Sequence, residues 1–359
     1  MKKLAATLAC VLLATGLLAG CGKSTAKVEM NVPAEGDGAI TETINYDFQE
    51  GMSTSLLTGE LVPDEVAKNR VVTCMINNID VAMPQSGLSA ADIMYECVVE
   101  GGITRLMGVF QNYKDIPKLG PVRSARHYYV DYSNEYDAVY THFGQTKYAV
   151  AEMEALKTEE LTPLNSAGAA AFYRDNARVA PHNAYTDGKR IVKAIKKSKF
   201  DKTTSLTTPR FDFNVDTEEL TAENAKQATR VNLTYNGYSH PYFVYNKKDG
   251  LYYRYQYGTK HIDDQTGKQL TFKNIIVQFT NYSNKDKKGY QEVDLVGSGK
   301  GYYITAGKRI PITWSKNSKA EYTNYFTEDG QALKVNPGKT FISVFPKADK
   351  KGVTFKDAK

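Results

Sequence analysis

The chain has 359 residues, and 42% of them are hydrophobic, which is enough to build real cores and excludes a largely disordered protein. The 46 basic residues outnumber the 40 acidic ones only slightly and are spread over small clusters, so we do not expect nucleic-acid binding. The four cysteines show no metal-binding spacing such as CxxC, and we expect neither a metal nor a cofactor.

The N-terminus has the pattern of a bacterial lipoprotein signal. Residues 1–3 include two lysines, a mostly apolar run continues to Leu17, and Leu-Ala-Gly directly precedes Cys21. A positive start, a short apolar core and small residues before the cleavage point are typical of a secretory signal, and the run is too short to span a bilayer. Because Leu-Ala-Gly-Cys is the bacterial lipobox, we predict a signal peptide at residues 1–20 and lipidation of Cys21. Acyl chains such as palmitate would then anchor the protein to the bacterial cell membrane, on its extracytoplasmic face.

Residues 21–55 are poor in large apolar side chains and contain Pro-Ala-Glu-Gly-Asp-Gly at positions 33–38. This composition is typical of a flexible linker. We predict a tether that holds the folded part away from the membrane.

An α+β domain is predicted for residues 56–200. A continuous apolar strand at 71–76 comes first, and residues 95–110 read as a β-hairpin whose turn is Gly101-Gly102. A helix over residues 90–99 is the competing interpretation. With a two-residue turn, Val98 would face Arg105, and Glu96, Glu100 and Arg105 would share one face of the sheet. These three side chains could form a functional site or a set of surface ion pairs.

The second part of this domain alternates strands and helices. Gly120-Pro121 marks a turn, Ser124 is a candidate N-cap for a helix to about residue 134, and a strand over 137–143 ends with His142. Helices are expected at about 147–156 and 186–197, the latter preceded by Pro-His-Asn at 181–183. Ligands tend to bind where a strand ends before a helix in an open α/β sheet, so we expect a site near His142.

A smaller, β-rich C-terminal domain is predicted for residues 208–348, after a connection rich in Thr and Lys. Turn residues such as Asn236-Gly237 and Asp249-Gly250 separate its short strands. The expected strands lie at 231–235, 242–246, 251–257, 275–280, 302–306, 310–314 and 340–345. The fold class is therefore α+β, with a layered β/α sandwich followed by the β-rich domain.

Several longer motifs resemble one known family. Val-Glu-Gly-Gly-Ile-Thr-Arg at 99–105, Gly-Pro-Val-Arg-Ser-Ala-Arg at 120–126, Pro-His-Asn at 181–183 and Asn-Pro-Gly-Lys-Thr at 336–340 are similar to the YerB-like bacterial lipoproteins. The resemblance covers about residues 55–347. It implies two domains of unknown function behind a lipoprotein leader, with an N-terminal α+β layered sandwich, and it implies no reaction. The chain departs from the family at residues 142–146, where relatives more often have His-x-Gly-Gly-Ser-Pro.

No complete catalytic constellation is present, and no catalytic residue can be named. The leading hypothesis is a non-enzymatic binding or adaptor protein of the cell envelope, with an envelope polymer or a protein as partner. Arginine forks match carboxylate and phosphate groups. The candidate ligand-binding residues are Glu96, Glu100, Arg105, Arg123, Arg126, His142, Arg178, His182 and Asn183.

Two alternatives stay open. One is a hydrolase or lyase that cleaves cell-wall glycan, with Glu96 or Glu100 and His142 as acid and base. The other is a structural spacer without a ligand. Cys74 and Cys97, both in apolar runs, are either two buried thiols or a disulfide, which is allowed outside the membrane.

Overall fold

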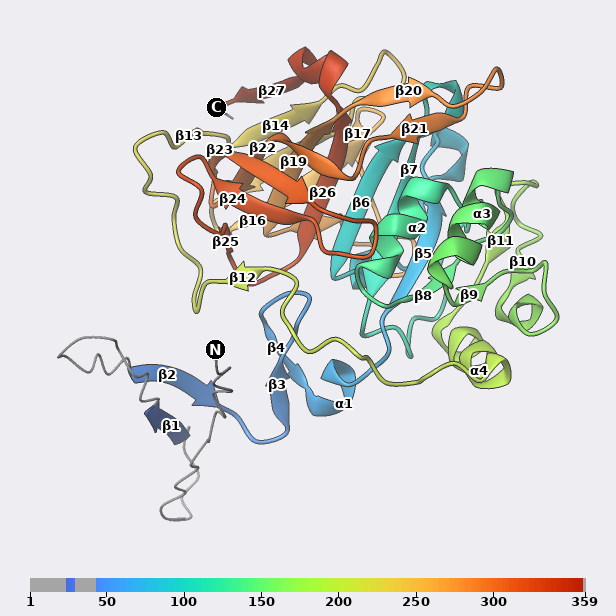
Figure 1. Ribbon diagram of the computed structural model, residues 1–359, viewed down its shortest axis with the longest axis horizontal. Coiled ribbons are helices and arrows are strands. Elements are labelled where there is room, and N and C mark those ends of the chain that lie inside the picture. Colours follow the sequence, from blue (N-terminus) through green and yellow to red (C-terminus); the bar gives the residue numbers. More distant parts are fainter. Residues whose placement is uncertain (1–23, 30–42, 358–359) are drawn as a thin grey trace, which may run out of the picture. The chain divides into compact units, whose positions relative to one another are not determined.

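The computed structural model describes residues 24–29 and 43–357 (Figure 1). The chain divides into two compact units, Met1–Met52 and Ser53–Lys359. In the first, β1 (Ser24–Glu29) pairs antiparallel with β2 (Thr43–Phe48), within the stretch for which the sequence predicts a tether. The predicted signal peptide and Cys21 lie outside the described residues.

A large mixed sheet organises the second unit. In the described residues it has eleven strands, in which β19, β26 and β6 run parallel, as do β5, β8 and β9. Strands from both predicted domains therefore share one sheet, because Ile342 of β26 lies opposite Tyr95 of β6. The strand order is β13 (Lys226–Gln227), β23 (Lys308–Lys316), β22 (Gly297–Thr305), β19 (Asn274–Thr280), β26 (Thr340–Pro346), β6 (Ile93–Val98), β7 (Thr104–Phe110), β5 (Val72–Asn77), β8 (Val139–Thr141) and β9 (Glu160–Leu161), with β24 (Asn324–Thr327) paired to β23.

A second sheet packs on one face of this sheet. Phe243 and Phe272 of the second sheet meet Phe341 of β26, with ring centroids 4.9 and 5.3 Å apart. Burial of several such rings removes a large apolar area from water and supplies much of the cohesion between the layers. The six strands are β17 (Thr259–Lys260), β16 (Leu251–Gln256), β15 (Tyr242–Asn246), β14 (Arg230–Leu233), β27 (Val353–Lys356) and β18 (Thr271–Phe272).

Helices cover the large sheet on both faces. On the face opposite the second sheet, α2 (His127–Asn134) and α3 (Lys147–Leu156) bury a row of tyrosines, and Tyr132 lies 4.4 Å from Tyr95 between ring centroids. On the other face, α4 (Gly188–Ser198) inserts Ile191, Ala194 and Ile195 into the core that contains Val72. The chain is thus mixed α+β and strand-rich, as predicted.

Shorter elements complete the described structure. The remaining strands are β3 (Met52–Thr54), β4 (Leu61–Pro63), β10 (Tyr173–Arg174), β11 (Ala184–Tyr185), β12 (Asp212–Phe213), β20 (Tyr282–Asn284), β21 (Gln291–Val293) and β25 (Lys334–Val335). The helices not yet given are α1 (Asp64–Ala67) and the 3₁₀ turns Asp80–Ala82, Leu88–Ala90, Glu100–Gly102, Gly168–Ala171 and Lys347–Gly352. None of the helices described is both long and apolar enough to cross a membrane.

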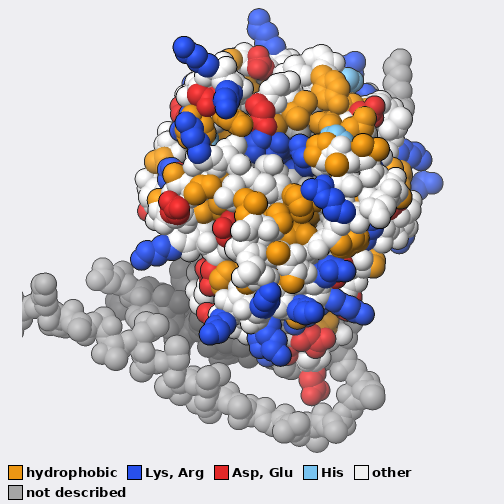
Figure 2. Space-filling model, turned by 90° about the vertical axis from the view of Figure 1, so that its right-hand side faces the viewer, with side chains coloured by type: hydrophobic (Ala, Val, Ile, Leu, Met, Phe, Trp, Pro, Cys, Tyr) orange, Lys and Arg blue, Asp and Glu red, His pale blue; other side chains and the backbone are white. Residues whose placement is uncertain are grey.

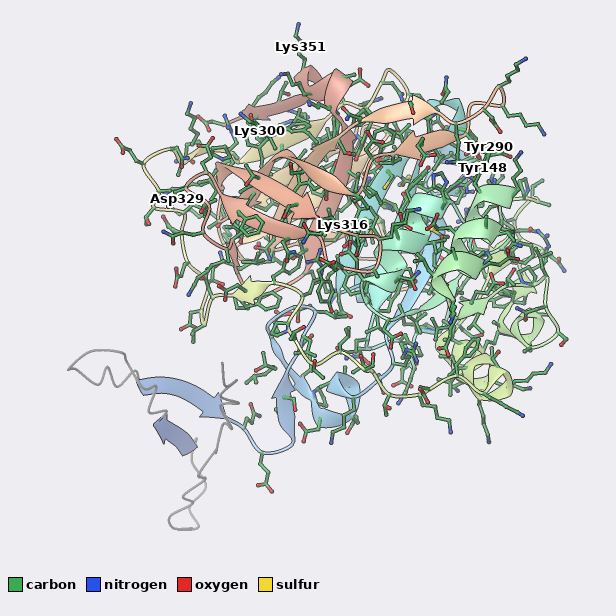
Figure 3. The ribbon with its side chains drawn as sticks, in the orientation of Figure 1. Tyr148, Tyr290, Lys300, Lys316, Asp329 and Lys351 are labelled. Carbon is green, nitrogen blue, oxygen red and sulfur yellow. The ribbon has the colours of Figure 1, made fainter. Side chains whose placement is uncertain are left out.

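Buried ion pairs cross from the N-terminal to the C-terminal part of the second unit. The Glu135 carboxylate accepts from Lys316 Nζ at 2.7 Å and lies 3.1 Å from an Arg210 nitrogen, and all three side chains are almost fully buried. Lys316 lies inside the body in Figure 3, whereas Lys351 and Asp329 lie at its margin and are exposed.

The two cysteines of the folded part are free and buried. Cys74 belongs to the core on one face of the large sheet and Cys97 to the core on the opposite face. Burial raises the pKa of both thiols well above the ordinary value, which leaves them protonated and unreactive. Of the two alternatives for this pair, the structure therefore has two buried thiols.

Candidate functional site

Three arginines and one glutamate converge at one end of the large sheet. Glu100, in the turn after β6, accepts from Arg126 Nε at 2.8 Å and also from the Arg126 terminal nitrogen. Arg105, at the start of β7, donates to the same carboxylate at 3.3 Å. Arg105 and Arg126 are buried, and Glu100 keeps 27% of its side chain exposed. We call Arg105, Arg123 and Arg126 with Glu100 the arginine cluster.

Arg123 is the most accessible arginine of the cluster. It is half-buried and donates one long hydrogen bond, 3.3 Å, to the Pro181 carbonyl. Its buried Nε has no hydrogen-bond partner within the described residues. A buried donor without an acceptor is costly, so the cluster favours an additional acceptor atom.

The arginine cluster carries an excess of positive charge. Burial, followed by repulsion from Arg126, lowers the pKa of Arg105 to about 10. The same two causes lower the pKa of Arg123. One carboxylate therefore does not balance three guanidinium groups in a poorly hydrated environment, and a further anion would be bound favourably.

The backbone places Arg123 between the ends of β5 and β8. Its N–H donates to the Met75 carbonyl at 2.9 Å, and its carbonyl accepts from the Phe143 N–H at 3.0 Å. Since β5 and β8 are parallel, the cluster lies at the carboxyl end of two parallel strands, where ligands of α/β sheets commonly bind.

His182 lies next to Arg123. Its Nδ1 is 2.8 Å from the Asn77 amide nitrogen, and burial together with the charge of Arg123 lowers the pKa of His182. A neutral His182 can accept from or donate to a ligand without adding charge. His182 therefore belongs to the surroundings of the arginine cluster.

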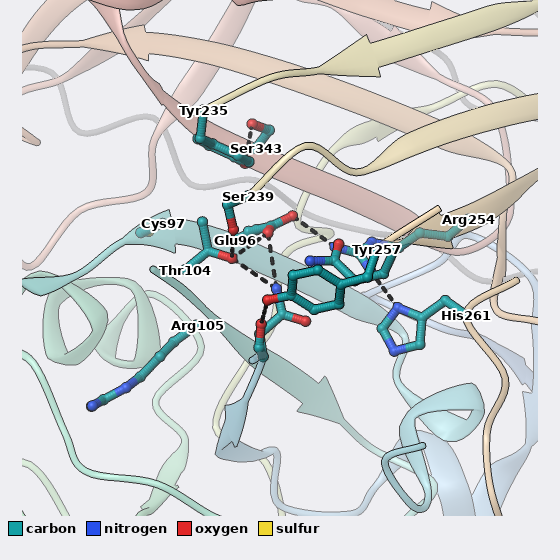
Figure 4. Close-up of polar contacts among 12 residues, drawn as sticks. Glu96, Cys97, Thr104, Arg105, Tyr235, Ser239, Arg254, Tyr257, His261 and Ser343 are labelled. Atoms are coloured by element: carbon teal, nitrogen blue, oxygen red, sulfur yellow. Dashed lines mark hydrogen bonds and ion pairs between the residues drawn. The ribbon is translucent and has the colours of Figure 1, made fainter. Parts of the chain in front are cut away.

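The hairpin prediction was wrong by one residue. Val98 lies opposite Thr104, and the Val99 N–H donates to the Ile103 carbonyl, so the turn holds three residues, Glu100–Gly102. A one-residue shift moves a side chain to the other face of a sheet. Glu96 and Arg105 consequently lie on opposite faces, and Arg105 points away from the Glu96 network in Figure 4.

Glu96 is part of a fully buried polar network (Figure 4). Its carboxylate accepts from Arg254 at 3.0 Å, from Asn78 at 3.0 Å and from Thr104 at 2.7 Å. Arg254 continues the network to His261. Glu96 thus joins the two sheets and has no access to a substrate.

His142 and Ser124 hold backbone in place. His142 is fully buried, with Nε2 2.7 Å from a Glu160 oxygen and Nδ1 2.9 Å from the Gly144 carbonyl. Ser124 donates to the Phe143 carbonyl instead of capping α2, which begins at His127 with Arg126 at the N-cap, so the predicted cap was wrong. The structure therefore does not bring His142 together with Glu96.

Arg178 and Asn183 also lie outside the cluster's hydrogen bonds. Arg178 donates to the carbonyl oxygens of Met83 and Pro84, the latter at 2.7 Å. Asn183 accepts from Arg174 at 2.6 Å. Both side chains stabilise loops. Within the described part of the chain, no group of His, Cys, Asp and Glu is arranged to hold a metal ion.

Two neighbours of the cluster were missed by the sequence analysis. Tyr290, at the end of the β20–β21 hairpin, has its ring centroid 5.5 Å from the Arg126 guanidinium carbon, and it contacts Tyr148 of α3 edge-on (Figure 3). Asn77 binds His182. No local pattern connects a tyrosine at 290 with an arginine at 126, because the contact depends on how distant segments pack.

The ionisation of Glu100 makes the stability of the folded protein depend on pH. Burial opposes ionisation, but hydrogen bonds from Arg126 and the charges of Arg105 and Arg126 outweigh it, and the pKa of Glu100 is lowered from 4.5. A carboxyl group with a lowered pKa stabilises the fold above its unfolded pKa, and this is lost as the pH falls through the folded value. We expect Glu100→Gln to lower the free energy of unfolding by its full amount above about pH 4.5, and by progressively less at lower pH. Urea unfolding of the wild type and of Glu100→Gln at several pH values around 4.5 measures the difference in their free energies of unfolding. A difference that does not change with pH would show that the Glu100 carboxylate does not stabilise the fold through its charge.

The comparisons with known proteins agree with this architecture. The chain belongs to the family described as "Protein of unknown function (DUF3048)": the model of its N-terminal domain matches residues 57–201, and that of its C-terminal domain matches residues 231–342. The curated relative "Putative lipoprotein YerB" of Bacillus subtilis (strain 168) is 32% identical over 295 residues, which are 82% of this chain and 86% of the relative. The crystal structure of YerB from Bacillus subtilis matches with a TM-score of 0.74 and 29% identity, over 85% of this chain and 100% of that chain. The YerB-like membership predicted from the motifs is confirmed.

Proposed function

We propose that this protein is a lipoprotein of the bacterial cell envelope that binds an anionic group at the arginine cluster. Lipidated Cys21, behind a cleaved signal peptide, would anchor it to the cell membrane on the extracytoplasmic face. The lipobox and the similarity to a relative named as a lipoprotein support the anchor. The ligand would be a carboxylated or phosphorylated envelope polymer, or an acidic segment of a protein partner.

The observation that carries this proposal is the excess of guanidinium groups over carboxylates in the cluster. Arg105 and Arg126 share Glu100, while the Arg123 Nε has no hydrogen-bond partner among the residues that the structure describes. Guanidinium groups bind carboxylate and phosphate through paired N–H···O bonds that become strong where water is excluded. The role is binding and not turnover, since Glu96 and His142 are buried in other contacts.

Inorganic phosphate is the simplest probe of the site. A ligand that binds only the folded state raises its stability, so phosphate at constant ionic strength should raise the Tm of the 53–359 unit by about 2 °C or more. Arg123→Ala should abolish this shift. Because the Arg123 side chain donates one long hydrogen bond within the described residues and is repelled by Arg126, the variant should be as stable as the wild type without phosphate.

Arg230→Ala is the matched control, since it removes the same charge from the second sheet, where Arg230 stacks on Tyr242. It should keep the phosphate shift. An equal shift in Arg123→Ala and the wild type would exclude the arginine cluster as the binding site.

A further inference from the structure

A second basic region lies at the start of α4, apart from the arginine cluster. A surface cavity of about 670 Å³ is open there. Four of its lining side chains are cationic and two are acidic: Lys114, Lys189, Arg190 and Lys193 against Asp115 and Asp187. With Lys196 and Lys197 on the same helix, we call these cations the basic α4 face. Figure 2 shows Lys and Arg side chains gathered over the lower part of the face it presents, the side on which α4 lies in Figure 1.

The local sequence explains how this face is built. Ile191, Ala194 and Ile195 bury one side of α4 in the core, which leaves its charged residues in solvent. Gly188 lies against the loop that follows β7: a Cβ there would be 2.1 Å from the Tyr113 carbonyl oxygen. Only glycine allows this approach, which brings Lys114 to the cavity.

The acidic residues do not neutralise the face. Asp187 caps α4 by accepting from the Arg190 N–H at 2.8 Å, and it pairs with the Arg190 Nε at 3.0 Å. Within the part of the chain that the structure describes, no ion pair holds Lys114, Lys189 or Lys193. These ammonium groups are therefore available to a ligand.

The extent of the face indicates an array of anions and not a single one. Lys189 and Lys197 are eight residues apart, about 12 Å along a helix at 1.5 Å per residue, which is more than one phosphate can contact. Val192 stands among the lysines with 39% of its surface exposed, and Leu164, near the Ser166 carbonyl that Lys197 binds, is 67% exposed. Basic side chains interspersed with exposed apolar ones fit the boundary between lipid headgroups and acyl chains better than a fully hydrated polymer.

We propose that the basic α4 face docks on the phosphate headgroups of an anionic membrane surface. The cavity would take one headgroup, and Lys196 and Lys197 would contact its neighbours. This contact is independent of the lipid anchor and of the arginine cluster, because all of its residues belong to the 53–359 unit and none belongs to the cluster.

The test is sedimentation of the 53–359 unit with vesicles. This unit is compact and contains both cores, and it lacks Cys21. It should bind phosphatidylglycerol vesicles, fail to bind phosphatidylcholine vesicles, and lose binding as salt rises. Lys189→Glu with Lys193→Glu should weaken binding by about tenfold or more.

The matched control is Lys350→Glu with Lys351→Glu, which gives the same net charge at an exposed 3₁₀ turn; Lys351 lies at the top of Figure 3, away from α4. This control and Arg123→Ala should both bind vesicles as the wild type does. Equal losses of vesicle binding in the two double variants would show that only the net charge matters. A loss of vesicle binding in Arg123→Ala would place the membrane contact at the arginine cluster. If the wild-type unit does not bind vesicles, there is no membrane contact to explain. Each of these results would overturn the proposal.

Discussion

Glu135→Gln should lower the free energy of unfolding by about 3–5 kcal/mol, since breaking a buried ion pair leaves charge without compensation. Glu135 is fully buried and serves two cations, Lys316 at 2.7 Å and Arg210 at 3.1 Å. It also accepts from the Thr323 hydroxyl at 2.8 Å. A neutral amide would leave both cations without a counter-charge and would uncouple α2 from β23.

Urea unfolding of the 53–359 unit at neutral pH measures this loss. Glu219→Gln is the matched control: Glu219 pairs with Lys308 at 3.1 Å but keeps 73% of its side chain exposed. Exposed pairs contribute less than about 1 kcal/mol. If the two substitutions cost the same, Glu135 does not have the role that we assign to it.

Glu96 and Arg254 should show strong coupling in a double-mutant cycle. Glu96→Gln and Arg254→Met should each cost about 3–5 kcal/mol, because each leaves the other charge buried and unpaired. The double variant should be clearly more stable than the sum of the two losses predicts, since it removes both charges together. The coupling has a plain structural basis, a 3.0 Å contact between two fully buried side chains that joins β6 to β16.

Unfolding of the four proteins by urea completes this cycle. Losses that add within about 0.5 kcal/mol would mean that the two side chains act independently. In that case the Glu96 network would not hold the second sheet on the large sheet.

Elements with strong local signals could be predicted from the sequence. Helix α3 spans the predicted residues 147–156, and Thr146 caps it by accepting from the Ala149 N–H at 3.1 Å. Strand β15 has the predicted bounds, 242–246. Hydrophobic periodicity, caps and turn residues act over a few residues, so the sequence alone reveals them.

The turn of the β6–β7 hairpin could not be predicted from local sequence signals. Gly101 and Gly102 both adopt positive φ angles, 71° each, as a two-residue turn requires, but Glu100 joins them in a three-residue turn. The choice between the two turns depends on contacts across the sheet. The shift separates Glu96 from Arg105 and places Glu100 with Arg126, which changes the candidate site.

The pairing and packing of segments far apart in the chain could not be predicted from the sequence. Pairing of β26 with β6 joins residues about 250 positions apart, across the boundary between the two domains that the sequence predicts. The motif at 120–126 indicated arginines near a turn, but their convergence on Glu100 depends on how this segment inserts between β5 and β8. Burial was also beyond local reasoning: Glu96 and His142, two of the three residues predicted for acid–base chemistry, are fully enclosed, whereas Glu100 keeps part of its side chain exposed.

Anion binding without turnover at the arginine cluster is best tested by mixing the 53–359 unit with purified peptidoglycan and its anionic polymers. Both co-sedimentation and the release of soluble fragments are measured. We predict co-sedimentation without release, lost in Arg123→Ala and kept in Arg230→Ala. Release of soluble glycan fragments would show turnover, and equal sedimentation of Arg123→Ala and the wild type would show that the arginine cluster does not bind these polymers.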